Sequence, residues 1–231
     1  MSALDWWAEA GVDVLVDDAP RDWLAPAPAI ERSPVPGVPA SAPTPLPTPA
    51  TALPADLAAF RAWLLIDAAV PGPVAARLDA IGDPAQGDVV VVDMPEAEDR
   101  AAGALLSGEV GTLFDRMLGA IGLARASVYL LPLSPARPSI GRLREADLTA
   151  LTPLLHHHLG LAAPRRLLLL GDAPAQALLR APAARARDAV HQVEIGGRQV
   201  ATVASFAPRM VHQSRDYRQP VWADLQRFIA L

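Results

Sequence analysis

The sequence of 231 residues contains no cysteine, and all of its basic residues are arginine, with no lysine. Without thiolates the chain forms no disulfide, no iron–sulfur cluster and no thiolate zinc site. Without lysine it has neither a Schiff-base residue nor a P-loop lysine. Chemistry is therefore left to carboxylates, histidines and the backbone, and we expect no metal and no cofactor.

Long apolar runs are also missing. None reaches the roughly 18 residues that a membrane helix needs, and the N-terminus lacks the basic-then-apolar layout of a secretory signal. The formal net charge of −5, from 25 acidic and 20 basic side chains, argues against nonspecific wrapping of nucleic acid, because that affinity comes from neutralising phosphates. We expect a cytoplasmic protein without a membrane partner, and leave open whether it binds DNA locally.

Proline is abundant and unevenly distributed. Eleven of the 24 prolines fall within residues 20–54, in stretches that exclude helix and central strand and favour extended polyproline-like coil. The sequence therefore predicts three parts: an N-terminal segment over residues 1–24, a linker over 25–54 and a globular domain over 55–231.

The N-terminal segment carries three of the five tryptophans. So few residues cannot bury three indoles by themselves, so the segment either folds back onto the main domain or is a tethered motif that docks into a partner. A long, stiff tether favours the second interpretation, since tryptophan is a preferred anchor at interfaces. The residues expected to contact the partner are Asp5, Trp6, Trp7, Gly11, Val12, Val14 and Trp23.

Hydrophobic periodicity after the linker predicts alternating strands and helices. The run Val89–Val92 is typical of a strand covered on both faces. Such alternation indicates a three-layer αβα fold with a central, mostly parallel sheet. Strands are predicted over 89–92, 127–131, 166–170, 189–195 and 200–205, and helices over 56–69, 74–81, 108–121, 145–159, 174–179 and 220–230.

Ligands of such folds bind beyond the carboxyl ends of the strands, which directs attention to loops 93–99, 132–142, 171–174 and 206–215. The first loop holds four carboxylates that suit a general base or a divalent metal, or that simply favour a helix start. The carboxylates are Asp93, Glu96, Glu98 and Asp99. Two later loops supply four arginines that form a basic rim. These arginines either bind the DNA backbone, bind an acidic protein surface or are simply solvated: Arg137, Arg142, Arg209 and Arg215.

The histidines offer little chemistry. His156–His158 are consecutive on a predicted helix, so their side chains point about 100° apart and cannot converge on one ion. We expect a solvated helix end. His191 and His212 have no serine or acidic partner at a spacing typical of a catalytic triad.

Residues 86–231 resemble the uracil-DNA glycosylase superfamily, especially its iron–sulfur branch. This resemblance implies a uracil-DNA glycosylase-like α/β fold. The similar motifs are Val91-Val92-Asp93-Met94-Pro95 with Glu98-Asp99, the glycine-rich helix start Gly108–Leu118, Val128–Pro132 with Arg137-Pro138, Leu168–Gly171, and Ser205–Arg209 followed by Trp222–Leu225.

Other residues stand in this sequence where the resemblance places the catalytic and base-binding residues. A glycosylase stacks the flipped base on an aromatic ring, reads its edge with an amide and stabilises the departing anion with a donor. By the resemblance these positions fall on Leu106, Pro132 and Ala207, with Arg209 in place of a serine and Ala136 in place of a cluster cysteine. Leucine, proline and alanine side chains donate no hydrogen bond, so the resemblance predicts a scaffold that is not an enzyme.

A noncatalytic relative of this fold exists in the psi subunits of the bacterial DNA polymerase III clamp loader. Their N-terminal peptide is similar to Asp5-Trp6 with Gly11-Val12 and the later Trp23. That resemblance implies binding to the clamp-loader ATPase through the peptide, and to a chi-like subunit and single-stranded DNA-binding protein through the domain.

The sequence therefore predicts a noncatalytic, psi-like accessory subunit of the bacterial replisome. One alternative is an active uracil-DNA glycosylase of base-excision repair with an atypical site, in which Asp93, Glu96 or Glu98 is the general base. Another is a DNA-binding adaptor outside the replisome.

Overall fold

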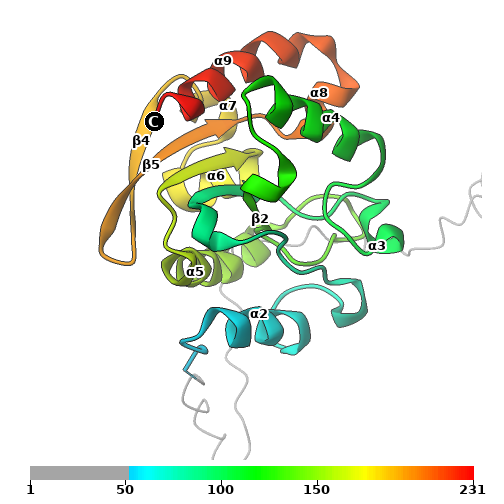
Figure 1. Cartoon of the computed structure of the whole chain (residues 1–231). Helices are drawn as coiled ribbons and strands as arrows, with labels where there is room; N and C mark the ends of the chain where they lie inside the picture. Colours follow the sequence, from blue (N-terminus) through cyan, green and yellow to red (C-terminus); the bar gives the residue numbers. More distant parts are fainter. Residues whose placement is uncertain (1–51) are drawn as a thin grey trace, which may run out of the picture. The chain divides into compact units, whose positions relative to one another are not determined.

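The computed structural model describes residues 52–231, which form an α/β domain around one sheet (Figure 1). The sheet has the strand order β2-β1-β3-β5-β4, in which β4 alone runs antiparallel to its neighbour. This architecture confirms the predicted fold class. The strands are β1 (Asp88–Val92), β2 (Tyr129–Pro132), β3 (Arg166–Leu170), β4 (Val190–Ile195) and β5 (Arg198–Ser205).

Helices cover both faces of the sheet (Figure 1). Helices α5, α6 and α7 pack on one face, and α4, α8 and α9 on the other, while α2 packs on α5. The helices are α2 (Leu57–Ile66), α3 (Asp99–Ala102), α4 (Gly108–Ala120), α5 (Glu145–Ala162), α6 (Asp172–Leu179), α7 (Ala183–Ala186), α8 (Pro208–Gln213) and α9 (Arg218–Ile229).

Strand β1 shows why the valine run is buried throughout. Val89 and Val91 point into the core under α5, whereas Val90 and Val92 point into the core under α4 and α9. All four side chains are at most 4% exposed. A strand in the middle of a parallel sheet has no solvent face, so it needs an apolar residue at each position.

The parallel strands end level with one another. Val92 lies opposite Pro132 on β2 and opposite Leu170 on β3, and Leu170 lies opposite Ser205 on β5. The residues that follow these ends therefore emerge side by side at one edge of the sheet. The first residue beyond β1 is Asp93, and Gly171 follows β3.

The helix predicted over residues 74–81 is wrong. Only the 3₁₀ turn Val74–Ala76 forms, after which the chain is extended and pairs with the segment around β2. Ile81 exchanges two backbone hydrogen bonds of 2.8 Å with Leu130, and the Leu78 N–H donates to the Pro135 carbonyl. Pairing with a distant segment overrides the helical propensity of this short stretch.

The histidine tract is not the solvated helix end that the sequence predicts. His158 is 4% exposed, shares a hydrogen bond of 2.9 Å with the Tyr129 hydroxyl, and lies edge-on to Phe60 of α2. Burial lowers the pKa of His158 to about 4 and raises that of Tyr129 to about 12. His158 is therefore a neutral core residue that joins α5 to β2.

Several predictions fall outside the described residues. The proposed partner contacts Asp5, Trp6, Trp7, Gly11, Val12, Val14 and Trp23 all lie there, as does most of the predicted linker, and the division of the chain into three parts stays a prediction. None of the helices within residues 52–231 is both long and apolar enough to cross a bilayer.

Candidate functional site

A cleft of about 670 Å³ opens at the carboxyl ends of β1 and β3. Its position is a topological switch point, since the chain leaves β1 for β2 on one side and returns to β3 on the other, and such points are the usual ligand sites of open α/β sheets. The volume lies within the range typical of small-molecule sites. The polar lining residues are Asp93, Arg142, Arg144, Glu145, Thr149, Thr152, Asp172, Gln176 and Arg209.

Asp93 is the innermost carboxylate of the cleft. It is 3% exposed, accepts a hydrogen bond of 3.1 Å from the Ala173 N–H at the start of α6, and forms an ion pair with Arg209. Gly171 makes room for it, because a Cβ on this residue, whose φ is +121°, would collide with the carboxylate. Burial raises the pKa of Asp93 even though Arg209 acts to lower it.

Arg209 reaches the cleft from the start of α8, 116 residues from Asp93 in the sequence. Its guanidinium also lies 3.6 Å from Glu96. Burial, the largest influence, acts to lower the pKa of Arg209, but Asp93 and Glu96 together outweigh it and raise that pKa. The guanidinium is therefore a fixed positive charge between two carboxylates.

Glu96 is the second carboxylate at Arg209. Arg137 approaches it to 3.5 Å and also donates to the Pro95 carbonyl at 3.1 Å. Burial raises the pKa of Glu96, while Arg209 and Arg137 act to lower it. Two of the predicted basic rim residues, Arg137 and Arg209, thus face inward to the carboxylates.

Asp99 has a structural role. It is fully buried and accepts hydrogen bonds of 2.6–2.8 Å from the N–H groups of Glu96, Leu106 and Ser107 and from the Ser107 hydroxyl. Four donors occupy the acceptor sites of both carboxylate oxygens, so none is left for a ligand. Asp99 therefore fixes the loop that carries Glu96.

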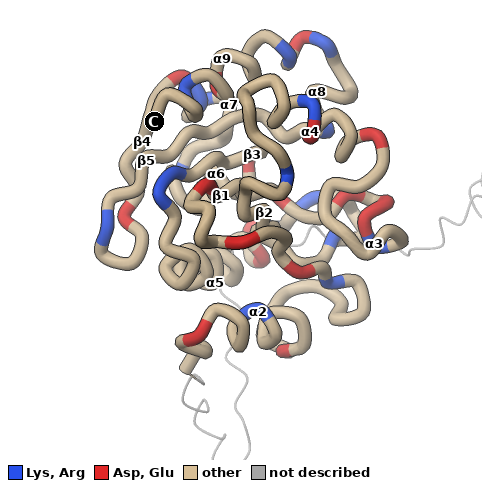
Figure 2. The backbone as a smooth tube through the Cα atoms, viewed as in Figure 1, with Lys and Arg blue, Asp and Glu red and all other residues tan. Residues whose placement is uncertain are grey.

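The remaining predicted residues are spread out. Glu98 is exposed and lies over Gly108 at the start of α4, so it does not join Asp93 and Glu96. Arg142 is exposed at the cleft, whereas Arg215 lies in a 3₁₀ turn outside it. Within residues 52–231 no three potential metal ligands are grouped, so the acidic loop is not assembled as a metal site. Figure 2 shows basic and acidic residues mixed over the whole domain.

The positions that the resemblance marks for base recognition do not line this cleft. Leu106 and Ala207 are 2% exposed, and Pro132 is buried as the last residue of β2. The lining groups that sequence reasoning missed come from helices, among them Thr152 on α5 and Gln176 on α6. For Gln176 the only signal in the sequence is that α6 directly follows β3.

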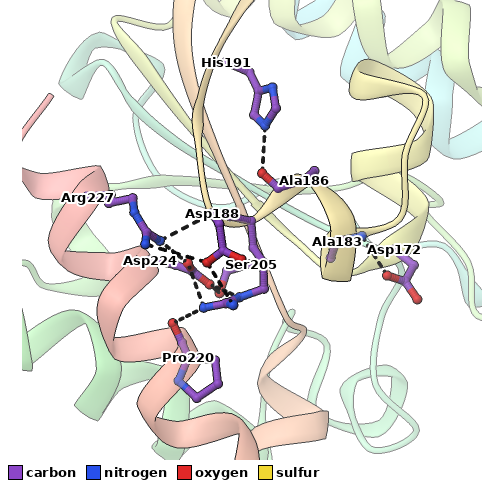
Figure 3. Close-up of polar contacts among 10 residues, drawn as sticks. Asp172, Ala183, Ala186, Asp188, His191, Ser205, Pro220, Asp224 and Arg227 are labelled. Carbon is purple, nitrogen blue, oxygen red and sulfur yellow. Dashed lines mark hydrogen bonds and ion pairs between the residues drawn. The ribbon is translucent and has the colours of Figure 1, made fainter.

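Another buried carboxylate, Asp224, lies on the opposite side of the sheet, where α9 meets β5 (Figure 3). It accepts hydrogen bonds from the Ser205 hydroxyl at 2.7 Å, from Arg227 at 2.7 Å and from Arg187 at 3.1 and 3.2 Å. Arg187 also donates to the Pro220 carbonyl. This cluster joins α9, β5 and the segment before β4, and its residues do not line the cleft around Asp93.

The residues do not fit an iron–sulfur cluster. Such a cluster needs thiolate ligands, and the chain has none. Ala136 stands where the resemblance places a cluster cysteine. Its methyl packs against Gly72, so closely that a Cβ added to Gly72 would lie only 2.8 Å from it. The neighbouring loop is instead held by Arg77, which is 9% exposed and donates to the carbonyls of Leu64, Asp67, Val70 and Gly72.

Comparison with known proteins gives two matches. A family model described as the uracil DNA glycosylase superfamily matches residues 81–226, which is more than half of the chain. A protein named type-4 uracil-DNA glycosylase, from Pyrobaculum aerophilum, is 28% identical over 154 residues, covering 64% of this chain and 79% of that protein.

These matches overturn two predictions. The chain resembles a glycosylase rather than a clamp-loader subunit, so the psi-like replisome function is wrong, and a relative named as an enzyme contradicts the prediction of a pseudoenzyme. The prediction takes the substituted positions Leu106, Pro132 and Ala207 as the whole site. Polar groups that the sequence did not bring together, Asp93 with Arg209, stand in the cleft instead.

Proposed function

The chain belongs to the uracil-DNA glycosylase superfamily, and we propose that it removes uracil from DNA by hydrolysing the N-glycosidic bond in the cleft around Asp93. The observation that carries this proposal is the pairing of a buried carboxylate with a cation at the switch point of the sheet. One negative and one positive group, fixed beside each other in a partly desolvated cleft, match the two charges that develop when a glycosidic bond breaks.

Asp93 serves as the general base. Burial raises the pKa of Asp93 above that of an ordinary aspartate, and so toward neutral pH. A carboxylate with a raised pKa is more effective in accepting a proton from water. The Ala173 N–H holds one oxygen, which fixes the orientation of the carboxylate relative to the cleft. The negative charge also favours the positive charge that builds up on the deoxyribose.

Arg209 stabilises the leaving group. In the reaction the bond between C1′ and uracil N1 breaks, and its electron pair leaves with the base. A water oxygen bonds to C1′, and the water proton passes to Asp93 and from there to solvent. The uracil anion then carries the negative charge, which the guanidinium of Arg209, always protonated, neutralises.

DNA is the partner that this reaction requires. The target base must leave the helix before it can enter a cleft, and the exposed Arg142 at the rim suits contact with a phosphate of the extruded nucleotide. Such contacts position the strand without reading its sequence. A cytoplasmic location stays a prediction, which cell fractionation would test.

The test is single-turnover excision from an oligonucleotide with one uracil, in single-stranded and paired form. We expect the full chain to release uracil and Asp93→Asn to be slower by about 10²–10⁴-fold, as is usual when a general base is lost. Glu194→Gln is the matched control, since Glu194 is an exposed carboxylate on β4. No release by the wild-type chain, or undiminished release by Asp93→Asn in folded protein, would contradict the proposal.

A further inference from the structure

A second concave surface lies between α4, α8 and α9. It consists of two adjoining hollows of about 340 and 330 Å³, which share Leu113, Arg116 and Arg218 in their walls. We call it the α4–α9 groove. None of the residues assigned to glycosidic hydrolysis lines either hollow, so a ligand bound in this groove is independent of the proposed reaction.

The floor of the α4–α9 groove is apolar. Met117, Val211, Val221 and Leu225 contribute to it and are at most 8% exposed, so they belong to the core and form a firm base. At the edge stands Trp222, which is 42% exposed although it is a large aromatic residue. A half-exposed tryptophan beside an apolar hollow is a typical anchor of a protein interface.

The rim of the groove is mainly basic. Arg116 and Arg218 are exposed, and neither takes part in any of the ion pairs formed within residues 52–231. His212 completes the rim, 3.4 Å from Glu109. The rim thus presents two guanidinium groups outside these ion pairs, on either side of an apolar hollow.

We propose that the α4–α9 groove binds a short acidic segment of a partner protein. One large apolar side chain of that segment fills the hollow beside Trp222, and flanking carboxylates pair with Arg116 and Arg218. A hollow of about 340 Å³ is at the small end of ligand sites and therefore suits one or two side chains. Opposite charge at the rim supplies specificity and speeds association.

Single-stranded DNA fits the surface less well. Strands of nucleic acid are held by a positive groove that follows the backbone and by several aromatic platforms for successive bases. Here only two arginines line the surface, and the walls of the two hollows contain one tryptophan, Trp222, and no phenylalanine or tyrosine. The partner class favoured by these features is an acidic peptide.

The test is selection from a random peptide library displayed on phage, with the full-length protein immobilised. Phage retained by the Trp222→Ala variant are removed in a subtractive step. We expect the enriched peptides to have acidic residues around one large apolar residue. Synthesised with a fluorescent label, they should bind the wild-type chain in anisotropy titrations and lose roughly tenfold or more in affinity with Trp222→Ala.

Two further variants make the test specific. Leu113→Glu places a carboxylate in the wall of the groove and should also abolish binding, while the double variant Arg116→Ser with Arg218→Ser should weaken it and reduce its dependence on salt. The matched control replaces two exposed arginines outside the groove, Arg185→Ser with Arg198→Ser, and should bind as the wild type does. Thermal unfolding of each variant checks that it is folded.

Three results would overturn the proposal. The first is that no peptides are enriched, or that the enriched ones show no acidic excess. The second is that folded Trp222→Ala and Leu113→Glu variants bind the selected peptides as tightly as the wild type. The third is that a single-stranded oligonucleotide displaces the peptides and itself loses affinity with Trp222→Ala, which would assign the groove to DNA.

Discussion

Asp93 and Asp224 are both buried aspartates bound by arginine, yet their surroundings differ. Asp224 is fully buried, and a hydroxyl and two guanidinium groups occupy its oxygens (Figure 3). Asp93 has one arginine and one backbone N–H, and it borders a cleft of about 670 Å³. The first arrangement leaves no room for a ligand, whereas the second leaves a charged pair facing open space.

The contrast separates structural from chemical use of the same residue type. A buried carboxylate with all its acceptor sites occupied contributes to the rigidity of the fold. One that keeps a free side, with a pKa raised by burial, is typical of a functional site. Burial raises the pKa of Asp224 as well, so the pKa direction alone does not distinguish the two, and the open side of Asp93 does.

The largest predicted effect is the loss of stability that follows from removing Asp224. Asp224→Ala leaves Arg187 and Arg227 with only the exposed Asp188 as a carboxylate partner, so we expect the free energy of unfolding to fall by about 3–5 kcal/mol. Asp93→Asn should lower it by less, because Arg209 keeps Glu96 as a carboxylate partner and the amide fills the space of the carboxylate. Urea denaturation measures both. Equal losses for the two variants would show that the two aspartates have the same structural role.

The next largest effect should be that of Arg209→Gln on the rate of uracil excision. Arg209→Gln removes the charge that neutralises the leaving base, and we expect excision to slow by about 10²–10³-fold. Arg209 also acts to lower the pKa of Asp93, so its loss should move the acid limb of the pH–rate profile to higher pH. Single-turnover rates over a pH series measure both quantities. A slower rate with an unmoved acid limb would mean that Asp93 is not the titrating base.

His158, a third buried group, differs from both aspartates in its pH dependence. The pKa of His158 is lowered from 6.5 to about 4 in the folded chain. Between these two values the unfolded chain binds a proton at His158 and the folded chain does not. Stability must therefore fall as the pH drops from above 6.5 toward 4. This group should account for about 2 kcal/mol of stability lost between about pH 7.5 and pH 5.

The matched variant is His158→Gln, which keeps a polar partner for Tyr129 but does not titrate. Denaturation at the two pH values should show a smaller loss for the variant than for the wild-type chain. If both chains lose the same stability, His158 does not carry the acid sensitivity.

Local patterns in the sequence predict most of the fold. The valine run of β1, the leucine run of β3 and the hairpin around Gly196-Gly197 each specify their structure within a few residues, and the structure has these elements. The stretch 74–81 was mispredicted because its pairing partners, around Leu130 and Pro135, are about fifty residues away. Propensity carries no information about such partners.

The candidate site is less predictable, for the same reason. Asp93 was found because it follows β1 directly. Arg209 was expected only on the rim, since no local signal shows that the start of α8 points back to the end of β1. His158 was misplaced because its burial depends on α2, whose Phe60 packs against it. Contacts between distant segments therefore decide the site.

Arg77 closes the loop before β1 with four hydrogen bonds to carbonyl groups, and it pairs with Ala136, which stands where the resemblance places a cluster cysteine. Hydrogen bonds of this kind form as soon as the polypeptide folds. This part of the domain therefore needs no iron supply and no cluster-assembly factors to mature, and neither chelators nor oxidants have a bond there to attack.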